Sequence, residues 1–157
     1  MLDPLNRELR TDRLRWWHLP AVAEMERAIF GPEAWSEGLL WTELAAGHDY
    51  RAVFDCAGDG PDRIVGYAGV ALNDHEAWIN NIAVDPAARR RGVGTRLMED
   101  AIARARASGV KSVFLEVAVD NGAAQRLYDN FGFYGIGLRK NYYQTTGTDA
   151  AVMRMDL

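Results

Sequence analysis

The spacing of apolar residues divides this chain into helices and strands. After a polar leader, residues 14–30 predict a short strand that runs into a helix, because apolar positions recur at helical spacing in the second half of that segment. Gly31-Pro32 breaks the pattern, and residues 36–46 predict a second helix for which Ser36 is the expected N-cap. The opening part of the chain is therefore expected to hold a strand and two helices.

The rest of the chain continues with more strands than helices. Apolar runs predict strands over residues 50–56, 63–72, 76–84, 112–119, 133–139 and 151–157. Helices with one apolar face are predicted over residues 94–108 and 121–131. Elements in this order predict a mixed α/β sheet with crossover helices and no linker.

Composition suits a single folded domain over residues 1–157, since 48% of the residues are hydrophobic and 25% are charged. The formal net charge of −4 gives no broad positive field, which argues against a nucleic-acid partner. The single cysteine, Cys56, excludes an intramolecular disulfide and suits a reducing cytoplasm.

Membrane and metal functions also find no support in the sequence. No apolar run approaches the roughly 20 residues that span a bilayer, and residues 1–13 lack the apolar core of a signal peptide. The histidines are too widely scattered to suggest a metal site, standing at His18, His48 and His75. We therefore expect a cytoplasmic protein with no membrane partner and no bound metal.

The most distinctive local feature is an arginine-glycine stretch between a predicted strand and a predicted helix, "RRRGVG" at 89–94. A helix start exposes unpaired backbone N–H groups, and glycines let a bulky anion approach the backbone closely. The stretch therefore favours a phosphate-binding loop. Spacing alone leaves an equally good alternative, the solvated start of an arginine-rich helix.

Two familiar nucleotide loops do not fit this stretch. A P-loop needs a lysine directly after its second glycine, whereas Thr95 and Arg96 follow Gly94. A dinucleotide loop needs a third glycine, and Leu97 stands at that position. Nucleic-acid binding is also disfavoured, because three arginines on an acidic chain have no aromatic residues between them.

Five pieces of sequence carry a resemblance to a known family: "NIAVDP", "RRRGVG", "LEVAVDN", "AAQRLYDNFGF" and "LRKNYY". The second piece fits the Gln/Arg-x-x-Gly-x-Gly/Ala motif of the GNAT superfamily of N-acetyltransferases. The set as a whole resembles the RimI branch, which acetylates the N-terminal alanine of the small-subunit ribosomal protein bS18. The resemblance implies the GNAT fold, an α/β fold with a mixed, mostly antiparallel sheet of six to seven strands, splayed in the middle, and about four helices.

The resemblance also implies acetyl-coenzyme A (acetyl-CoA) as co-substrate. In the family, backbone amides of the arginine-glycine loop hold the pyrophosphate, and the preceding strand pairs with the pantetheine arm and supplies an oxyanion donor. The arginine side chains would screen the phosphate charge. The expected cofactor-binding residues are Ile82, Ala83, Val84, Arg89, Arg90, Arg91, Gly92, Val93, Gly94, Thr95 and Asn121. Asn121 is also well placed to be a helix N-cap, and the two roles are compatible.

Glu116 stands inside an otherwise apolar predicted strand. Strand alternation puts it on the same face as Phe114 and Ala118, where a carboxylate is costly unless it is hydrogen-bonded or lines a cleft. The residues alone fit a solvent-facing glutamate equally well. Its position matches the glutamate that acts as general base in the RimI branch, so the resemblance implies that role, through water, for Glu116.

Tyr128 lies on the apolar face of its predicted helix, and the pattern alone favours a core tyrosine. Its context "LYDNFGF" matches the family's "LYxxxGF", whose tyrosine donates a proton to the coenzyme A thiolate. The resemblance therefore implies that Tyr128 is the general acid.

The resemblance further implies two walls of a peptide site. "PEAWSEGLL" matches the segment that carries a family tryptophan, here Trp35, and "RKNYY" resembles the loop that closes the opposite side with Tyr142 and Tyr143. A pair of aromatic side chains at a sheet edge is the equally weighted alternative for the two tyrosines.

The expected function is direct acetyl transfer from acetyl-CoA to a protein N-terminus, by an enzyme that is a monomer or a weak homodimer. A terminal α-amino group titrates near ~8 and lysine near ~10.4, so the former is the easier nucleophile to prepare. Two alternatives stay open: an acetyltransferase of lysine side chains or small amines, and a non-catalytic acyl-CoA-binding subunit.

Overall fold

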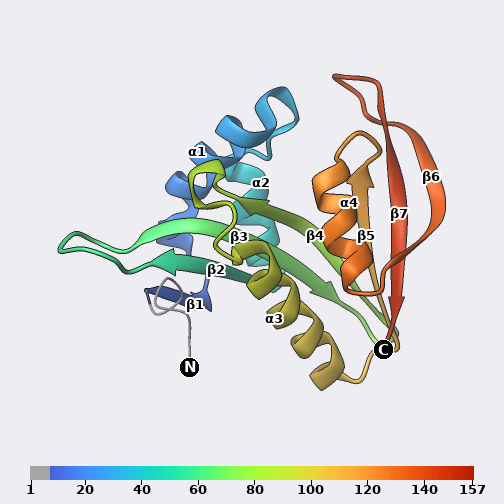
Figure 1. Cartoon of the computed structure of the whole chain (residues 1–157), viewed down its shortest axis with the longest axis horizontal. Coiled ribbons are helices and arrows are strands. Elements are labelled where there is room, and N and C mark those ends of the chain that lie inside the picture. The colour runs from blue at the N-terminus through green and yellow to red at the C-terminus, as the bar shows by residue number, and fades with distance from the viewer. Residues whose placement is uncertain (1–7) are drawn as a thin grey trace. The chain divides into compact units, whose positions relative to one another are not determined.

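The computed structural model describes residues 8–157 (Figure 1). The strands are β1 (Leu9–Arg13), β2 (Asp49–Asp55), β3 (Arg63–Leu72), β4 (Glu76–Val84), β5 (Ser112–Ala118), β6 (Tyr134–Tyr143) and β7 (Thr148–Asp156). The α-helices are α1 (Leu19–Phe30), α2 (Glu37–Ala45), α3 (Val93–Ser108) and α4 (Gly122–Asn130). Short 3₁₀ turns are η2 (Trp16–His18), η3 (Gly31–Glu33) and η4 (Pro86–Ala88).

The strands form a sheet in the order β1-β2-β3-β4-β5-β7-β6. β4 and β5 pair in parallel, whereas β1 with β2, β5 with β7, and β7 with β6 pair antiparallel. Seven strands and four α-helices over residues 8–157 confirm the predicted fold class, a mixed and mostly antiparallel sheet with about four helices. Over the same residues, none of the helices has the length and apolar character that crossing a membrane requires.

The chain divides into two compact units. The N-terminal unit holds the chain up to Gly69 together with Asn81–Asp100, and the C-terminal unit holds Val70–Asn80 together with Ala101–Leu157. Strands β3 and β4 contribute residues to both units. The single domain expected over residues 1–157 stays a prediction.

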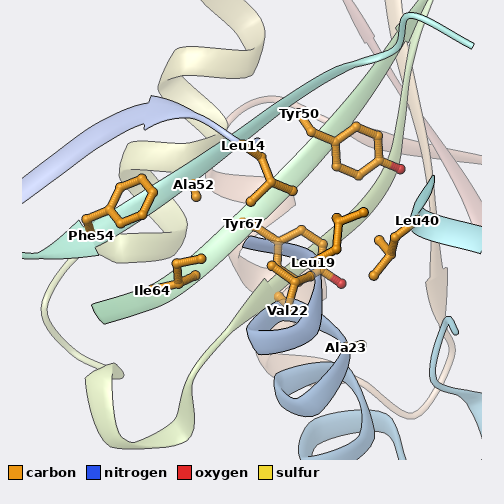
Figure 2. Close-up of a cluster of buried hydrophobic side chains, with 11 residues drawn as sticks. Leu14, Leu19, Val22, Ala23, Leu40, Tyr50, Ala52, Phe54, Ile64 and Tyr67 are labelled. Carbon is orange, nitrogen blue, oxygen red and sulfur yellow. The ribbon is translucent and has the colours of Figure 1, made fainter. Parts of the chain in front are cut away.

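In the N-terminal unit, β2 and β3 carry buried side chains on both faces. Helices α1 and α2 cover one face, and Figure 2 shows the buried residues there: Leu14, Leu19, Val22, Ala23, Leu40, Tyr50, Ala52, Phe54, Ile64 and Tyr67. The start of α3 joins a second cluster on the other face, formed by Leu9, Val53, Val65, Ala68, Ala88, Val93 and Leu97. In β2, successive residues point to opposite faces, so Ala52 and Phe54 join the first cluster and Val53 joins the second.

Gly66 in β3 lets α3 approach the sheet closely. A Cβ atom on this glycine would lie 2.6 Å from Cγ1 of Val93 and 3.1 Å from the carbonyl oxygen of Ala83. Only a residue without a side chain permits this approach. Gly66 therefore helps to place the first turn of α3, directly after the arginine-glycine loop.

The first strand lies earlier than the sequence predicted. β1 pairs antiparallel with β2 from Leu9 opposite Asp55 to Arg13 opposite Arg51, inside the polar leader. The strand expected at the start of residues 14–30 is wrong, since that stretch forms η2 instead. β1 is an edge strand in which only Leu9 is buried, so it has no apolar alternation to reveal it.

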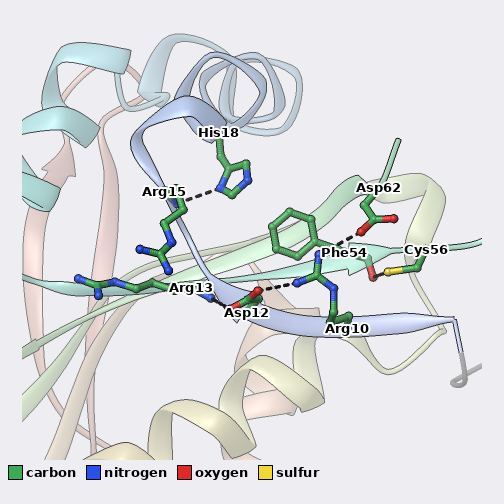
Figure 3. A network of polar contacts seen from close by, with 8 residues as sticks. All are labelled: Arg10, Asp12, Arg13, Arg15, His18, Phe54, Cys56 and Asp62. Atoms are coloured by element: carbon green, nitrogen blue, oxygen red, sulfur yellow. Dashed lines mark hydrogen bonds and ion pairs between the residues drawn. The ribbon is translucent and has the colours of Figure 1, made fainter. Parts of the chain in front are cut away.

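Ion pairs fix β1 at this edge (Figure 3). The Arg10 guanidinium lies 2.5 Å from Asp12 and 3.0 Å from Asp62, and it stacks over the ring of Phe54 with 4.7 Å to the centroid. These contacts tie β1 to the segment before β3 and to β2.

In the C-terminal unit, β5 pairs with two strands. Its parallel ladder with β4 runs from Glu76 opposite Ser112 to Ile79 opposite Leu115, and its antiparallel ladder with β7 covers residues 112–118. The β6–β7 ladder shifts register between Arg139 and Tyr143, where Asn141 has a positive φ of 52°. Residues 139–143, expected as a loop, thus end an irregular strand.

Candidate active site

The arginine-glycine loop leads directly into α3. The first helical hydrogen bond at this end runs from the N–H of Arg96 to the carbonyl of Gly92, at 2.9 Å. The N–H groups of Val93, Gly94 and Thr95 precede it and so have no carbonyl to bind within the helix. They form the partly positive end of a 16-residue helix, which favours an anion.

The loop backbone is bent at two left-handed positions. Gly92 has a φ of 74° and Arg90 a φ of 67°. Gly92 is exposed, and a Cβ atom on it would meet no other atom within 4 Å. The space over the loop therefore suits a bulky anion, while the conformation itself favours glycine at position 92.

Asp55 anchors the loop to β2. Its carboxylate lies 2.7 Å from Nη1 of Arg91, and this hydrogen bond holds the pKa of Asp55 below its ordinary value, aided by the backbone N–H of Ala57. The guanidinium of Arg91 is thus bound to protein, and the screening of a ligand's charge by the three arginine side chains stays a prediction. Arg89 and Arg90 are exposed.

The strand before the loop has the three residues expected along the pantetheine arm. Ala83 is buried, while Ile82 and Val84 are half-buried and pack against the cluster beneath α3. Directly after the strand, the N–H of Asp85 donates to the carbonyl of Val65 at 2.8 Å. This bond holds the end of β4 to β3 before the chain turns toward the loop.

Trp35 lies between η3 and α2 and is half-buried against the α1–α2 core cluster. Its backbone N–H donates to Oε2 of Glu26 at 3.1 Å. The next residue, Ser36, is the N-cap of α2 as predicted, since its Oγ accepts from the N–H of Leu39 at 3.1 Å.

In the C-terminal unit, Glu116 shares the half-buried face of β5 with Phe114 and Ala118, as strand alternation predicts. Its side chain is 16% exposed, and Oε1 lies 3.0 Å from Nε of Arg139 on β6. The hydroxyl of Tyr142 also bonds to this carboxylate. The ion pair with Arg139 therefore compensates the costly position of Glu116.

The two tyrosines at the end of β6 pack edge to face. The ring centroids of Tyr142 and Tyr143 lie 5.2 Å apart at 85°, and the guanidinium of Arg139 lies 5.8 Å from the Tyr142 ring. Burial and the bond to Glu116 raise the pKa of Tyr142 to about 12. The structure thus joins the expected base and one expected substrate contact in one cluster.

Tyr128 is buried in α4, where its side chain is 4% exposed and its ring centroid lies 6.1 Å from that of Phe133. Burial raises the pKa of its hydroxyl well above the ordinary value, and Tyr143 adds to the shift. The hydroxyl therefore stays protonated at neutral pH, as a proton donor must.

Asn121 is the N-cap of α4. Its side-chain oxygen accepts from the N–H of Ala124 at 3.2 Å, and its side chain is exposed. One turn further on, the Gln125 amide donates to the carbonyls of Ala118 and Val119, both at 3.0 Å. These bonds tie the start of α4 to the end of β5.

Three residues at these places were not singled out by the sequence. Asp55 holds the loop, Arg139 holds Glu116, and Glu26 holds the backbone at Trp35. Glu26 did carry a signal, because it continues the buried helical spacing of Leu19, Val22 and Ala23 as a charged residue.

Comparison with known proteins assigns the chain to a family. The acetyltransferase (GNAT) family matches residues 12–133. The N-alpha-acetyltransferase RimI of Mycobacterium tuberculosis is 39% identical over 139 residues, which cover 85% of this chain and 84% of that protein. The [ribosomal protein bS18]-alanine N-acetyltransferase of Salmonella typhimurium is 39% identical over 142 residues, covering 88% and 91%.

A solved structure agrees with these relatives. The crystal structure of the ribosomal-protein-S18-alanine N-acetyltransferase from Escherichia coli superposes with a TM-score of 0.79 and 31% identity, covering 94% of this chain and 93% of that one. The family match and these relatives define the chain as an acyltransferase. The chain belongs to the GNAT family and is an N-acetyltransferase.

Proposed function

We propose that this enzyme transfers the acetyl group of acetyl-CoA to the α-amino group of a protein N-terminus. The observation that carries the proposal is the Glu116 carboxylate, which lies 3.0 Å from Arg139 and beside Tyr142. The names of two relatives support it, an N-alpha-acetyltransferase and a [ribosomal protein bS18]-alanine N-acetyltransferase. The proposed substrate is the N-terminal alanine of ribosomal protein bS18, acetylated in the cytoplasm.

The cofactor site in this proposal is the start of α3 with the strand before it. The free N–H groups of Val93, Gly94 and Thr95 would bind the pyrophosphate, over the open space at Gly92. The backbone of residues 82–84 would pair with the pantetheine arm and donate a hydrogen bond to the thioester oxygen as it gains negative charge. Asn121 would contact the cofactor with the polar groups that capping leaves free.

Glu116 and Tyr128 move the protons. The amine nitrogen bonds to the carbonyl carbon while the carbon–sulfur bond breaks. Glu116 accepts, through water, the proton that the amine loses, and the protonated hydroxyl of Tyr128 gives a proton to the departing thiolate. After these two proton transfers, the products are a neutral amide and the neutral thiol of coenzyme A.

In this proposal, the segment at Trp35 and the tyrosine pair at the end of β6 each contact the peptide. Tyr142 and Tyr143 offer rigid aromatic area, and their hydroxyls suit a peptide backbone. Since Tyr142 also binds Glu116, the same side chain would align the base with the incoming N-terminus.

Substitution of Glu116 tests this proposal. We expect Glu116→Gln to lower kcat at least about 100-fold, because the amide cannot accept the proton, and to leave the Kd for acetyl-CoA nearly unchanged. Glu99→Gln, at an exposed position of α3, is the matched control and should retain wild-type turnover. Lost acetyl-CoA affinity with unchanged kcat in Glu116→Gln would assign Glu116 to binding and remove it as the base.

A further inference from the structure

A buried glutamate joins two segments to which the proposed function assigns the substrate and the cofactor. Glu26 on α1 has 0% exposure. Its Oε2 accepts from the backbone N–H of Trp35 at 3.1 Å, and its Oε1 accepts from Nδ2 of Asn81 at 2.6 Å. Asn81 also donates to the hydroxyl of Tyr67 at 2.9 Å. Glu26 therefore connects α1, the segment before α2, and β4.

Packing alone does not explain a glutamate at this position. Burial raises the pKa of Glu26, while the hydrogen bonds from Trp35 and Asn81 act in the opposite direction. A buried carboxylate is unfavourable even with such partners, and an apolar residue of similar volume often serves a core equally well or better. The two bonds thus point to a geometric role.

The segment between α1 and α2 depends on this contact more than β4 does. Within the segment, the N–H of Ala34 bonds locally to the carbonyl of Gly31 at 3.1 Å. The N–H of Trp35 instead reaches out of the segment to Glu26. β4, by contrast, is held between β3 and β5 in the sheet. Loss of Glu26 would therefore release the segment at Trp35 and leave the cofactor strand in place.

We propose that Glu26 is a positioning residue that fixes Trp35 relative to β4 and thereby shapes the substrate side of the site. The inference rests on the proposed function, which assigns Trp35 to the peptide wall. Glu26 itself has 0% exposure, so it acts through Trp35 and Asn81.

The test compares three substitutions of Glu26 in the full-length protein. Glu26→Met removes both acceptors at similar volume, and Glu26→Asp keeps the charge but is one methylene too short to reach both donors. Glu26→Gln can keep both hydrogen bonds. Its side-chain oxygen accepts from the N–H of Trp35, and its NH₂ group donates to the Asn81 side-chain oxygen once the Asn81 amide rotates by 180°. Tyr67 would then donate to the same Asn81 oxygen.

We expect Glu26→Met and Glu26→Asp to raise the KM for an N-terminal alanine peptide about tenfold and to speed exchange of the Trp35 amide hydrogen at least about tenfold. The Kd for acetyl-CoA should stay within about twofold of wild type. Glu26→Gln should restore both readouts to within about threefold of wild type. If Glu26→Met does not fold, Glu26→Asp tests the proposal by the same two measurements.

Glu24→Met is the matched control, because Glu24 lies on the same helix and is exposed. Peptide KM and Trp35 exchange in Glu26→Asp equal to those of Glu24→Met would overturn the proposal. A parallel loss of acetyl-CoA affinity would also overturn it, since that outcome indicates a general structural role. If the wild-type enzyme leaves N-terminal peptides unmodified, the proposed function fails, while the Trp35 exchange rate still decides whether Glu26 holds the segment.

Discussion

Asp55 on β2 and Arg91 in the arginine-glycine loop form an ion pair with 2.7 Å between Oδ2 and Nη1. Both side chains are largely buried, with 14% and 23% exposure. The pair fixes a loop that would otherwise be held only at its two ends. Arg91, which the sequence suggested as a ligand contact, therefore also forms an ion pair within the protein, with Asp55.

Removing this pair should cost stability in a pH-dependent way. The folded-state pKa of Asp55 is lowered, so its contribution is complete well above the unfolded carboxyl pKa and disappears as the pH falls through the lowered value. We expect Asp55→Asn to lower the free energy of unfolding by about 1 kcal/mol at pH 7. Urea titrations should show the difference from wild type shrinking below about pH 4.

Arg89→Ala is the control for this pair, because Arg89 is exposed and precedes the anchored residue. It should change the free energy of unfolding by less than about 0.5 kcal/mol. A pH-independent deficit in Asp55→Asn would show that the ion pair is not its cause.

The loop should bind acetyl-CoA through its backbone more than through its arginine side chains. Gly92 has a φ of 74°, so Gly92→Ala would favour another loop conformation in the free enzyme, and binding would have to reverse that change. Calorimetry should show acetyl-CoA affinity falling about tenfold for Gly92→Ala and less than about threefold for Arg89→Ala. The reverse order of effects would assign binding to the side chains.

Tyr128→Phe separates acid catalysis from packing. The phenylalanine ring keeps the buried contacts of α4, so the melting temperature should change little, whereas kcat should fall about 100-fold. Because burial raises the pKa of Tyr128, the wild-type hydroxyl stays protonated up to at least about pH 10. Tyr128 should therefore cause no alkaline decline in kcat below that pH, and wild-type turnover in Tyr128→Phe would exclude it as the acid.

Gly69 allows Tyr50 to pack across β3. A Cβ atom on Gly69 would lie 2.1 Å from Cζ of Tyr50, whose side chain is 2% exposed. We expect Gly69→Ala to reduce the free energy of unfolding by about 1–3 kcal/mol, because the ring must move in a close-packed core. Gly60→Ala, in open space, should stay within about 0.5 kcal/mol of wild type.

A double-mutant cycle identifies the clash as the cause. Tyr50→Ala opens the space that the added methyl group needs, so Gly69→Ala should cost much less in that background. Equal costs in the two backgrounds would point to backbone strain instead.

Elements with a buried apolar face could be predicted from the sequence. α3 begins one residue from its expected start, and Ser36 and Asn121 cap the helices they were expected to cap. β1 could not be predicted, because its ion pairs with Asp62 and its pairing with β2 join residues distant in sequence. The local pattern of apolar and polar residues does not indicate such distant partners.

The same limit applies to the site. The family motifs give Glu116, Tyr128 and the loop, but they do not show that Arg139 and Tyr142 bind the carboxylate. Glu26 and Asp55 act through partners that are nine or more residues away in sequence. Their roles depend on tertiary contacts, which spacing along one chain does not encode.

We propose that the acetyl acceptor is a terminal α-amino group. The most direct test of this proposal incubates the wild-type enzyme with acetyl-CoA and a peptide that has an N-terminal alanine and an internal lysine, and locates the acetyl group by tandem mass spectrometry. We expect acetylation of the α-amino group and no turnover of the same peptide with a blocked N-terminus. Acetylation of the lysine, or turnover that survives blocking, would contradict it.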